Sequence, residues 1–216
     1  MKIEICELSK VIDNNIILNN VTMSLESGNI YGFIGRNGSG KTMLLKMICG
    51  FVIPTQGNIL IDGKSILDKN YFNNKIRALI EKPKFLDGLS GFDNLKLLAS
   101  INNEIDDNEI NYWLDKLGLL KDKNKLYGKY SLGMKQKLGI IQVLMENPQI
   151  IILDEPLSGI DENGVNIIRD ILLHEKEKGK LIIISTHIKD DIEKMCNIIY
   201  KFDNGTVNLL TNNKKN

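Results

Sequence analysis

The stretch NIYGFIGRNGSGKT, residues 29–42, decides the fold of this chain. Its apolar half predicts a buried strand over residues 29–35, which runs directly into a glycine-rich loop. The segment KTMLLKMICG, residues 41–50, then predicts a helix that Gly50 ends. A strand, a glycine-rich loop and a helix in this order form the setting in which backbone N–H groups receive a phosphate. We therefore expect a phosphate site between residues 35 and 42.

Four residues of the loop fit the pattern G-x-x-x-x-G-K-[ST], namely Gly35, Gly40, Lys41 and Thr42. Glycines allow the backbone to wrap closely around phosphate oxygens. Lys41 can reach the β and γ phosphates of a nucleotide, and Thr42 can offer its hydroxyl to Mg²⁺. The other loop residues are expected to contact the nucleotide too: Arg36, Asn37, Gly38 and Ser39.

A second apolar strand, IIILDEP at residues 150–156, ends in two acids. Acids at the carboxyl end of a parallel strand stand where such sheets bind ligands. We expect Asp154 to hold Mg²⁺, directly or through water, and Glu155 to act as base toward the attacking water. His187 follows the strand IIISTHI, residues 182–188, and leaves it on the same rim. It is therefore placed to donate to the γ-phosphate.

The alternation of strands with helices along the chain predicts a mainly parallel sheet. Residues 3–8 and 21–25 alternate apolar with polar side chains, which predicts antiparallel strands at the N-terminus. From about residue 83 to residue 146 the pattern is helical instead. We expect an α/β fold with a P-loop NTPase core, built as a single domain over 1–216, with the helical lobe inserted at roughly 83–146.

Two sequence patterns in the helical lobe predict a helix start and a core residue. Ser90 with Asp93 three residues later has the spacing of a capping box, so a helix is expected to begin there. Ile110, Trp113 and Leu114 fall on one helical face. Such a stripe usually packs into a core, and we interpret Trp113 as a core residue.

Composition limits the classes of partner. The chain has 216 residues and a formal net charge of +1 at pH 7, so no electrostatic footprint favours nucleic acid or an acidic membrane surface. Its three cysteines lack metal-ligand spacing and suit reduced thiols in a reducing compartment. No signal peptide opens the chain, and no apolar run approaches the ~20 residues that a bilayer requires. We expect a soluble, cytoplasmic chain, so another polypeptide must supply any membrane part.

The stretch YSLGMKQKLGI, residues 130–140, predicts a second helix start that can receive an anion. In order, the phosphate loop, this helix start, the paired acids and His187 resemble the ATP-binding subunits of ABC transporters, over essentially the whole chain. The resemblance explains the second helix start. In that family two domains face each other head to tail, and the signature helix of one covers the γ-phosphate held by the other.

The resemblance implies roles for three further residues. Ser131 and Gly133 keep the family's signature pattern, while Leu132 and Met134 replace its usual Gly and Gln. The segment LSGID, residues 157–161, resembles the family's D-loop, which crosses the dimer interface, and Asp161 is the acid of that loop. ATP and Mg²⁺ are the implied cofactors. Whether the dimer is a homodimer or a heterodimer with a related subunit stays open.

One departure from the family concerns the nucleobase. The family commonly places an aromatic residue before the second strand to stack on adenine, whereas this chain offers Val11 and Ile12. Aromatic stacking on a base is worth about 1–3 kcal/mol. We expect Val11 to cover the base less strongly, which leaves the preference for ATP over GTP open.

The other departure is Glu81, in ALIEKP, where the family usually has a Gln that contacts Mg²⁺ and the water. A charged, nearly isosteric Glu is expected to bind Mg²⁺ more strongly and to share in catalysis. With residues 78–99 and the helix start at 130–140, it resembles the subgroup that exports bacitracin and lantibiotic peptides for self-protection. The alternative is a neutral change from Gln to Glu in a transporter of another kind.

The resemblance thus implies an ATPase subunit that powers a separate integral membrane permease from the inner face of the cell membrane. The lobe that follows Glu81 would be its hinge and docking surface. The alternative is a soluble ABC-type ATPase in translation or DNA repair, although those relatives tend to carry two nucleotide domains or a long coiled coil. A P-loop kinase or GTPase would not account for residues 130–140, and the chain has no Asn-Lys-x-Asp guanine signature.

Overall fold

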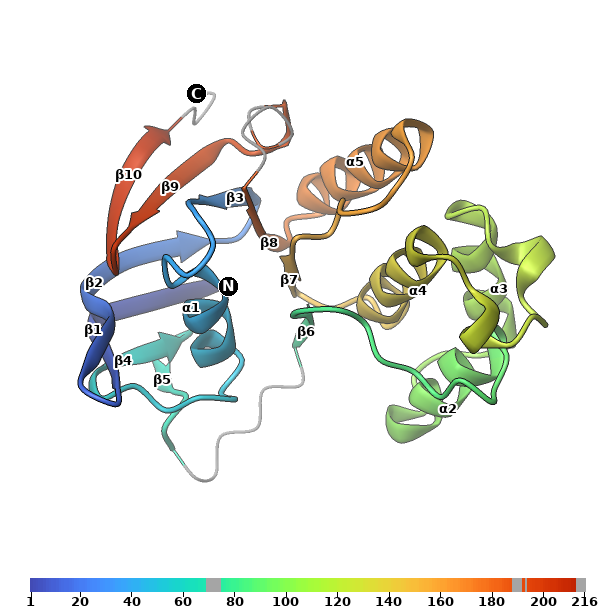
Figure 1. Ribbon diagram of the computed structural model, residues 1–216, viewed down its shortest axis with the longest axis horizontal. Helices are drawn as coiled ribbons and strands as arrows, with labels where there is room; N and C mark the ends of the chain where they lie inside the picture. The colour runs from blue at the N-terminus through green and yellow to red at the C-terminus, as the bar shows by residue number, and fades with distance from the viewer. Residues whose placement is uncertain (69–74, 188–191, 193, 213–216) are drawn as a thin grey trace.

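The computed structural model describes residues 1–68, 75–187, 192 and 194–212 (Figure 1). The strands in this part are β1 (Lys2–Ile12), β2 (Asn15–Glu26), β3 (Asn29–Ile34), β4 (Gln56–Ile61), β5 (Lys64–Ser65), β6 (Ile76–Leu79), β7 (Ile150–Asp154), β8 (Leu181–Thr186), β9 (Ile198–Asp203) and β10 (Thr206–Asn212). The helices are α1 (Lys41–Ile48), α2 (Gly91–Asn102), α3 (Asp107–Lys116), α4 (Leu132–Leu144) and α5 (Glu162–Glu177), with the 3-10 turns η1 (Leu120–Asp122) and η2 (Tyr127–Lys129).

The smaller sheet is antiparallel and has the strand order β2-β1-β4-β5. The expected N-terminal strands are present, but they extend into one long hairpin whose turn is Asp13-Asn14, both at positive φ. Asp and Asn tolerate that left-handed conformation. The sequence pattern covered only part of each strand because the β1–β2 register shifts three times between Ile5 and Val11. Each shift breaks the alternation on which the prediction rested.

The larger sheet has six strands in the order β10-β9-β3-β8-β7-β6. All neighbouring pairs from β9 to β6 are parallel, and β10 returns antiparallel to β9. The expected α/β class with a mainly parallel sheet and N-terminal antiparallel strands is confirmed. The glycine loop, the paired acids and His187 all follow the carboxyl ends of the parallel strands β3, β7 and β8.

Two cores lie on opposite faces of this parallel sheet. Side chains alternate between the faces along each strand. On β7, Ile150 and Ile152 pack with α1 and the antiparallel sheet, whereas Ile151 and Leu153 pack with the helices of the other face. The all-apolar runs at residues 150–153 and 181–184 are therefore typical of strands that are buried on both faces.

The segment predicted as a helical lobe contains α2, α3 and α4, on the right in Figure 1. Ser90 caps α2 by accepting a hydrogen bond from the Asp93 N–H at 3.0 Å, so the expected helix start is confirmed. The Asp93 carboxylate accepts the Ser90 hydroxyl instead of reaching back to a backbone N–H. Trp113 is buried and donates to Glu109, so it is a core residue as expected.

No helix within the described residues has both the length and the apolar character that crossing a membrane demands.

Candidate functional site

The glycine loop lies between β3 and α1, and β2 packs against it. Gly40 precedes α1 with φ of 103°, a conformation that suits glycine. A Cβ at Gly40 would meet Leu18 Cδ2 at 2.6 Å and the Ile17 carbonyl oxygen at 2.9 Å. Glycine at this position therefore lets β2 close over the loop.

Lys41 is almost fully buried at the start of α1. Its ammonium donates to the carbonyl oxygens of Gly35 at 2.7 Å and Arg36 at 3.0 Å. Burial lowers the pKa of Lys41, while the carboxylates of Glu155 and Asp154 act in the opposite direction. The positively charged group at the centre of the loop is thus the Lys41 ammonium, and it is close enough to Asp154 and Glu155 to interact with their charges.

Two observations on the loop fit a bound phosphate. The hydroxyl of Ser39 is buried and has no hydrogen-bond partner within the described part of the chain. Such a group normally finds a partner, so a ligand oxygen would satisfy it. In addition, no side chain caps the first turn of α1, so its free N–H groups can face an anion. The residues present therefore fit the phosphates of ATP.

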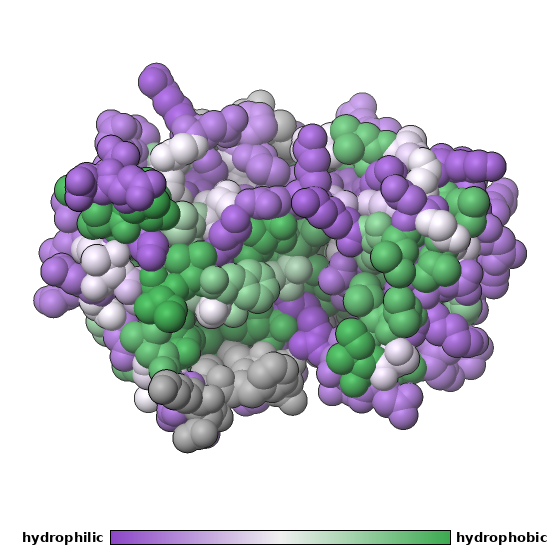
Figure 2. Space-filling view, turned by 60° about the horizontal axis from the view of Figure 1, so that its bottom comes forward, coloured by the Kyte–Doolittle hydropathy of each residue, from purple (hydrophilic) through white to green (hydrophobic). Residues whose placement is uncertain are grey.

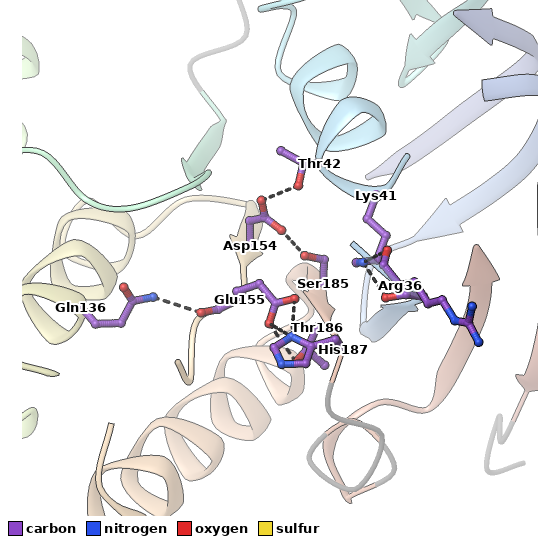
Figure 3. A network of polar contacts seen from close by, with 10 residues as sticks. Arg36, Lys41, Thr42, Gln136, Asp154, Glu155, Ser185, Thr186 and His187 are labelled. Carbon is purple, nitrogen blue, oxygen red and sulfur yellow. Dashed lines mark hydrogen bonds and ion pairs between the residues drawn. The ribbon is translucent and has the colours of Figure 1, made fainter. Parts of the chain in front are cut away.

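Asp154 is the last residue of β7, and its carboxylate accepts hydrogen bonds from both α1 and β8 (Figure 3). One carboxylate oxygen accepts the Thr42 hydroxyl at 2.8 Å, and the other accepts the Ser185 hydroxyl. Asp154 and Thr42 thus offer adjacent hard oxygens, the ligands that Mg²⁺ prefers. The described residues contain no cluster of three or more acidic, His or Cys side chains that could hold a metal. Mg²⁺ fits nonetheless, because it typically takes one or two carboxylates and completes its shell with water and phosphate oxygens.

Glu155 adopts a left-handed backbone with φ of 48°, which is strained for a non-glycine residue. Its N–H donates to the Ser185 carbonyl at 2.9 Å, and its carboxylate accepts the Thr186 hydroxyl at 3.2 Å. Nδ1 of His187 lies 3.0 Å from both carboxylate oxygens. Because an ionised carboxylate only accepts, Nδ1 carries the proton in this contact. The expected meeting of Glu155 and His187 at one rim is therefore present.

A cavity of about 370 Å³ joins the glycine loop to Asp154 and Glu155, and His187 is not among the residues that line it. Its lining residues are Ile17, Asn37, Gly38, Ser39, Gly40, Lys41, Thr42, Met43, Asp154 and Glu155. The sequence did not predict that Ile17 lines the cavity. Its only signal is that Ile17 is an apolar residue next to the fully buried Leu18 in β2. Val11 is not among the lining residues; it lies at the end of β1, partly exposed, with its N–H bonded to the Thr55 hydroxyl.

Glu81 lies just after β6 at φ of 65° and is not among the residues that line the cavity. Its carboxylate pairs with the Lys46 ammonium, Nζ to Oε1 2.5 Å, and its side chain is 62% exposed. The hydrogen bond and charge of Lys46 hold the pKa of Glu81 below its ordinary value. The roles expected for Glu81 and Val11 stay predictions.

Ser131 and Gly133 lie at the start of α4, and Asp161 lies at the start of α5, where it pairs with Lys137 of α4. The Ser131 hydroxyl caps α4 by accepting from the Met134 N–H at 3.2 Å. A Cβ on Gly133 would lie 2.8 Å from the Gly159 carbonyl oxygen, so α4 touches the loop before α5. Asp161 caps α5, and the nearby Lys137 ammonium, at 3.3 Å, holds its pKa low. None of the three lines the 370 Å³ cavity.

Gln136 is a buried residue of this region for which no role was expected from the sequence. Its amide donates to the carbonyl oxygens of Glu155 and Pro156, at 3.2 Å each. A signal existed, because Gln136 shares an otherwise apolar helical face with Ile140 and Val143. A buried polar side chain on such a face requires a partner.

A larger groove of about 1360 Å³ lies between α3 and α5. Acidic side chains such as Glu104, Glu109 and Asp170 outnumber the two lysines on its walls. It has no glycine loop and no buried ammonium, so it does not suit a triphosphate.

Comparison with known proteins agrees with this geometry. The model of the family described as ABC transporter matches residues 18–158. The uncharacterized ABC transporter ATP-binding protein YybJ of Bacillus subtilis (strain 168) is 41% identical over 94% of this chain and 93% of that protein. A solved structure described as the ATP binding subunit of an ABC transporter is 27% identical, with a TM-score of 0.87 over 97% of this chain and 90% of that one.

Two further relatives carry names that mention a transported compound. The bacitracin transport ATP-binding protein BcrA of Enterococcus faecalis is 36% identical over 91% of this chain, which spans only 65% of that relative. The lantibiotic transport ATP-binding protein SrtF of Streptococcus pyogenes is 35% identical over 91% of this chain and 85% of that protein.

Proposed function

Since the chain belongs to the ABC transporter family of ATP-binding domains, which hydrolyse ATP to power transport, we propose that it drives a separate integral membrane permease by closing and reopening an ATP-bound dimer. The observation that carries the proposal is the convergence of Lys41, Thr42, Asp154 and Glu155 on one cavity that is large enough for the phosphates. The alternative of a soluble ATPase in translation or DNA repair uses the same chemistry and differs only in its partner.

Each residue has a distinct task in the proposed hydrolysis. Lys41 and the Ser39 hydroxyl would bind the phosphates, and Thr42 and Asp154 would hold Mg²⁺, which supplies positive charge against the charge that develops on the phosphate. Glu155 orients the attacking water and takes its proton. The Ser185 hydroxyl fixes Asp154. His187 donates a hydrogen bond from Nδ1 to Glu155, and Nε2, when it also carries a proton, would donate to the γ-phosphate.

The second anion site belongs to the partner's nucleotide in this proposal. Ser131 and Gly133 stand at the N-terminus of α4, where free N–H groups and the helix dipole favour a negative charge. Placed across a head-to-tail dimer, they would cover the γ-phosphate held by the other subunit. Asp161 would lie at the interface between the two subunits. Two copies of this chain, or this chain and a relative, would share two nucleotides.

The permease would dock on the helical lobe. Leu97 and Ile101 stand four residues apart on α2, so they share one face of the helix, and their exposed fractions are 50% and 75%. Leu86, in the segment before α2, is 56% exposed. Figure 2 shows green apolar patches on this side of the molecule, over the part that holds the lobe. Exposed apolar patches of this kind mark interaction sites, and a permease would keep the chain at the inner face of the membrane.

The proposed cargo is a peptide antibiotic or a related amphipathic compound that the cell exports for self-protection. Support comes from Glu81, which stands in the place of the family's usual Gln, and from the names of the relatives BcrA and SrtF. The permease would select the cargo.

The test is purification of the tagged chain from gently solubilised membranes of its source cell, followed by mass spectrometry. A co-purifying polytopic protein is expected. Leu97→Glu with Ile101→Glu should abolish its recovery, whereas Ser100→Glu on the same helix should not, and both variants should bind ATP normally. Recovery of ribosomal or DNA-repair proteins alone would overturn the transport proposal in favour of the soluble alternative.

A further inference from the structure

Gln136 joins the signature helix to the proposed catalytic base. Its side chain is only 5% exposed, and its amide Nε2 lies 3.2 Å from both the Glu155 and the Pro156 carbonyl oxygens. Figure 3 shows the contact with Glu155. A primary amide has two N–H groups, so one Gln can serve both acceptors. The two carbonyls belong to the peptide groups that follow Glu155 directly.

The backbone of Glu155 needs such support. Its φ of 48° is a left-handed conformation that costs about 1–3 kcal/mol at a non-glycine residue and persists only where the surroundings enforce it. On the amino side, the N–H of Glu155 is fixed by the Ser185 carbonyl. On the carboxyl side, the fixing donor is Gln136. Together they set the direction in which the Glu155 side chain leaves the backbone.

Other contacts dock the first half of α4 along the same loop, residues 155–161. Gly133 packs against the Gly159 carbonyl oxygen, at a distance that excludes a Cβ. Lys137 pairs with Asp161 at 3.3 Å. Gln136 lies between these two contacts on the helix and is the one that reaches Glu155 itself. These contacts therefore hold the start of α4 and the loop of residues 155–161 together as one unit.

We propose that Gln136 is a positioning residue that sets the geometry of Glu155 and ties it to the start of α4. The part that concerns the second nucleotide rests on the proposed function. In a head-to-tail dimer, Ser131 and Gly133 would contact the partner's γ-phosphate, so a shift of α4 there would reach Glu155 of this subunit through Gln136. Each active site would then respond to the occupancy of the other.

Two substitutions isolate the amide donor. Gln136→Met keeps the length of the side chain but cannot donate, and Gln136→Glu keeps the shape but directs a carboxylate at two carbonyl oxygens. Gln142→Met, on the same helix and half-buried, is the matched control. We expect kcat for ATP hydrolysis to fall about 10- to 100-fold in Gln136→Met and further in Gln136→Glu, since small misplacements of a catalytic group have effects of this size. In Gln136→Met, KM for ATP should stay close to that of Gln142→Met, and the melting temperature should fall by only about 2–6 °C, because two buried carbonyl oxygens lose their donor.

Hydrogen exchange reads the positioning without hydrolysis. The amides of Glu155 and of residues 157–161 should exchange about threefold to tenfold faster in Gln136→Met than in Gln142→Met, with no change in the core strands. Retained kcat with unchanged exchange would overturn the proposal. So would a loss of kcat that comes with equal losses in ATP binding and melting temperature, which would indicate a packing role. A chain that engages no permease leaves the exchange result intact, so failure of the proposed function is distinguishable from failure of this inference.

Discussion

The Lys46 ammonium lies 2.5 Å from the Glu81 carboxylate and thereby joins α1 to the residue that follows β6. Lys46 stands four residues after Thr42, so both side chains leave the same face of α1, one turn apart. Because Lys46 lowers the pKa of Glu81, the carboxylate is ionised and ready to bind a cation. For the Mg²⁺ role expected from the sequence, Glu81 would have to leave Lys46 and reach an ion held beside Thr42 and Asp154.

Removing the competing ammonium should therefore favour Mg²⁺. In Lys46→Met, we expect the Mg²⁺ concentration for half-maximal ATP binding to fall by up to about fivefold, the range that an exposed ion pair allows. A Mg²⁺ titration of nucleotide binding at fixed ATP measures this. Lys46→Arg, which keeps the charge, should behave like the unsubstituted chain. The double variant Lys46→Met with Glu81→Gln is compared with Glu81→Gln alone. If the Mg²⁺ concentration for half-maximal ATP binding falls by the same factor between these two, Glu81 is not involved.

Glu155→Gln should separate binding from hydrolysis. The amide keeps the shape of the side chain but cannot accept a proton from water, so ATP hydrolysis should fall at least about 100-fold. ATP binding should persist, because Lys41, Ser39 and Thr42 are untouched. The variant should then accumulate as an ATP-bound dimer, measured by size-exclusion chromatography with and without ATP. ADP serves as the control nucleotide and should leave the protein monomeric. Only monomers of the variant with ATP would count against the shared site.

The larger part of the fold followed from local sequence patterns. The runs around Ile30, Ile151 and Ile183 read as buried strands because both faces of the parallel sheet are covered. The phosphate loop and the paired acids were assigned because each follows one of these strands. Since the carboxyl ends of parallel strands meet at one edge, the order of motifs was enough to bring Lys41 and Glu155 together.

The missed features depend on contacts between distant segments. Gln136 reaches carbonyl oxygens that lie 19 and 20 residues away, and Lys46 reaches Glu81 across 35 residues. Backbone carbonyls leave no trace in a sequence, so the partner of Gln136 was not predictable, although its burial was. Ile17 enters the cavity because β2 crosses the glycine loop, which is a consequence of the register of the hairpin.

An aromatic residue at position 11 should restore stacking on the base. We expect Val11→Tyr to raise ATP affinity about fivefold or more, because stacking on a base is worth about 1–3 kcal/mol. Calorimetric titration with ATP and with GTP measures the gain and any change in preference. Leu209→Tyr, which places an aromatic residue on exposed β10, is the control and should change neither affinity. An unchanged affinity in Val11→Tyr would mean that the base does not reach the end of β1.

A buried ion pair at the end of α5 should make stability depend on pH. Burial opposes the charge of Glu175, but the ammonium groups of Lys178 and Lys180 outweigh it and hold the Glu175 pKa below its ordinary value. A depressed pKa means that the stabilisation is complete above the unfolded-state pKa of about 4.3 and is lost as the pH falls through the folded-state pKa.

Glu175→Gln leaves the buried Lys180 without its carboxylate, so we expect a loss of about 3 kcal/mol at neutral pH, or about 6–12 °C in melting temperature. Thermal unfolding followed from about pH 7 to pH 3.5 should show a constant difference between the two proteins down to about pH 5 and a narrowing one below the unfolded-state pKa of about 4.3, while Glu177→Gln, an exposed neighbour, matches the unsubstituted chain throughout. A difference that stays constant across this range would assign the loss to packing, because a cavity does not titrate.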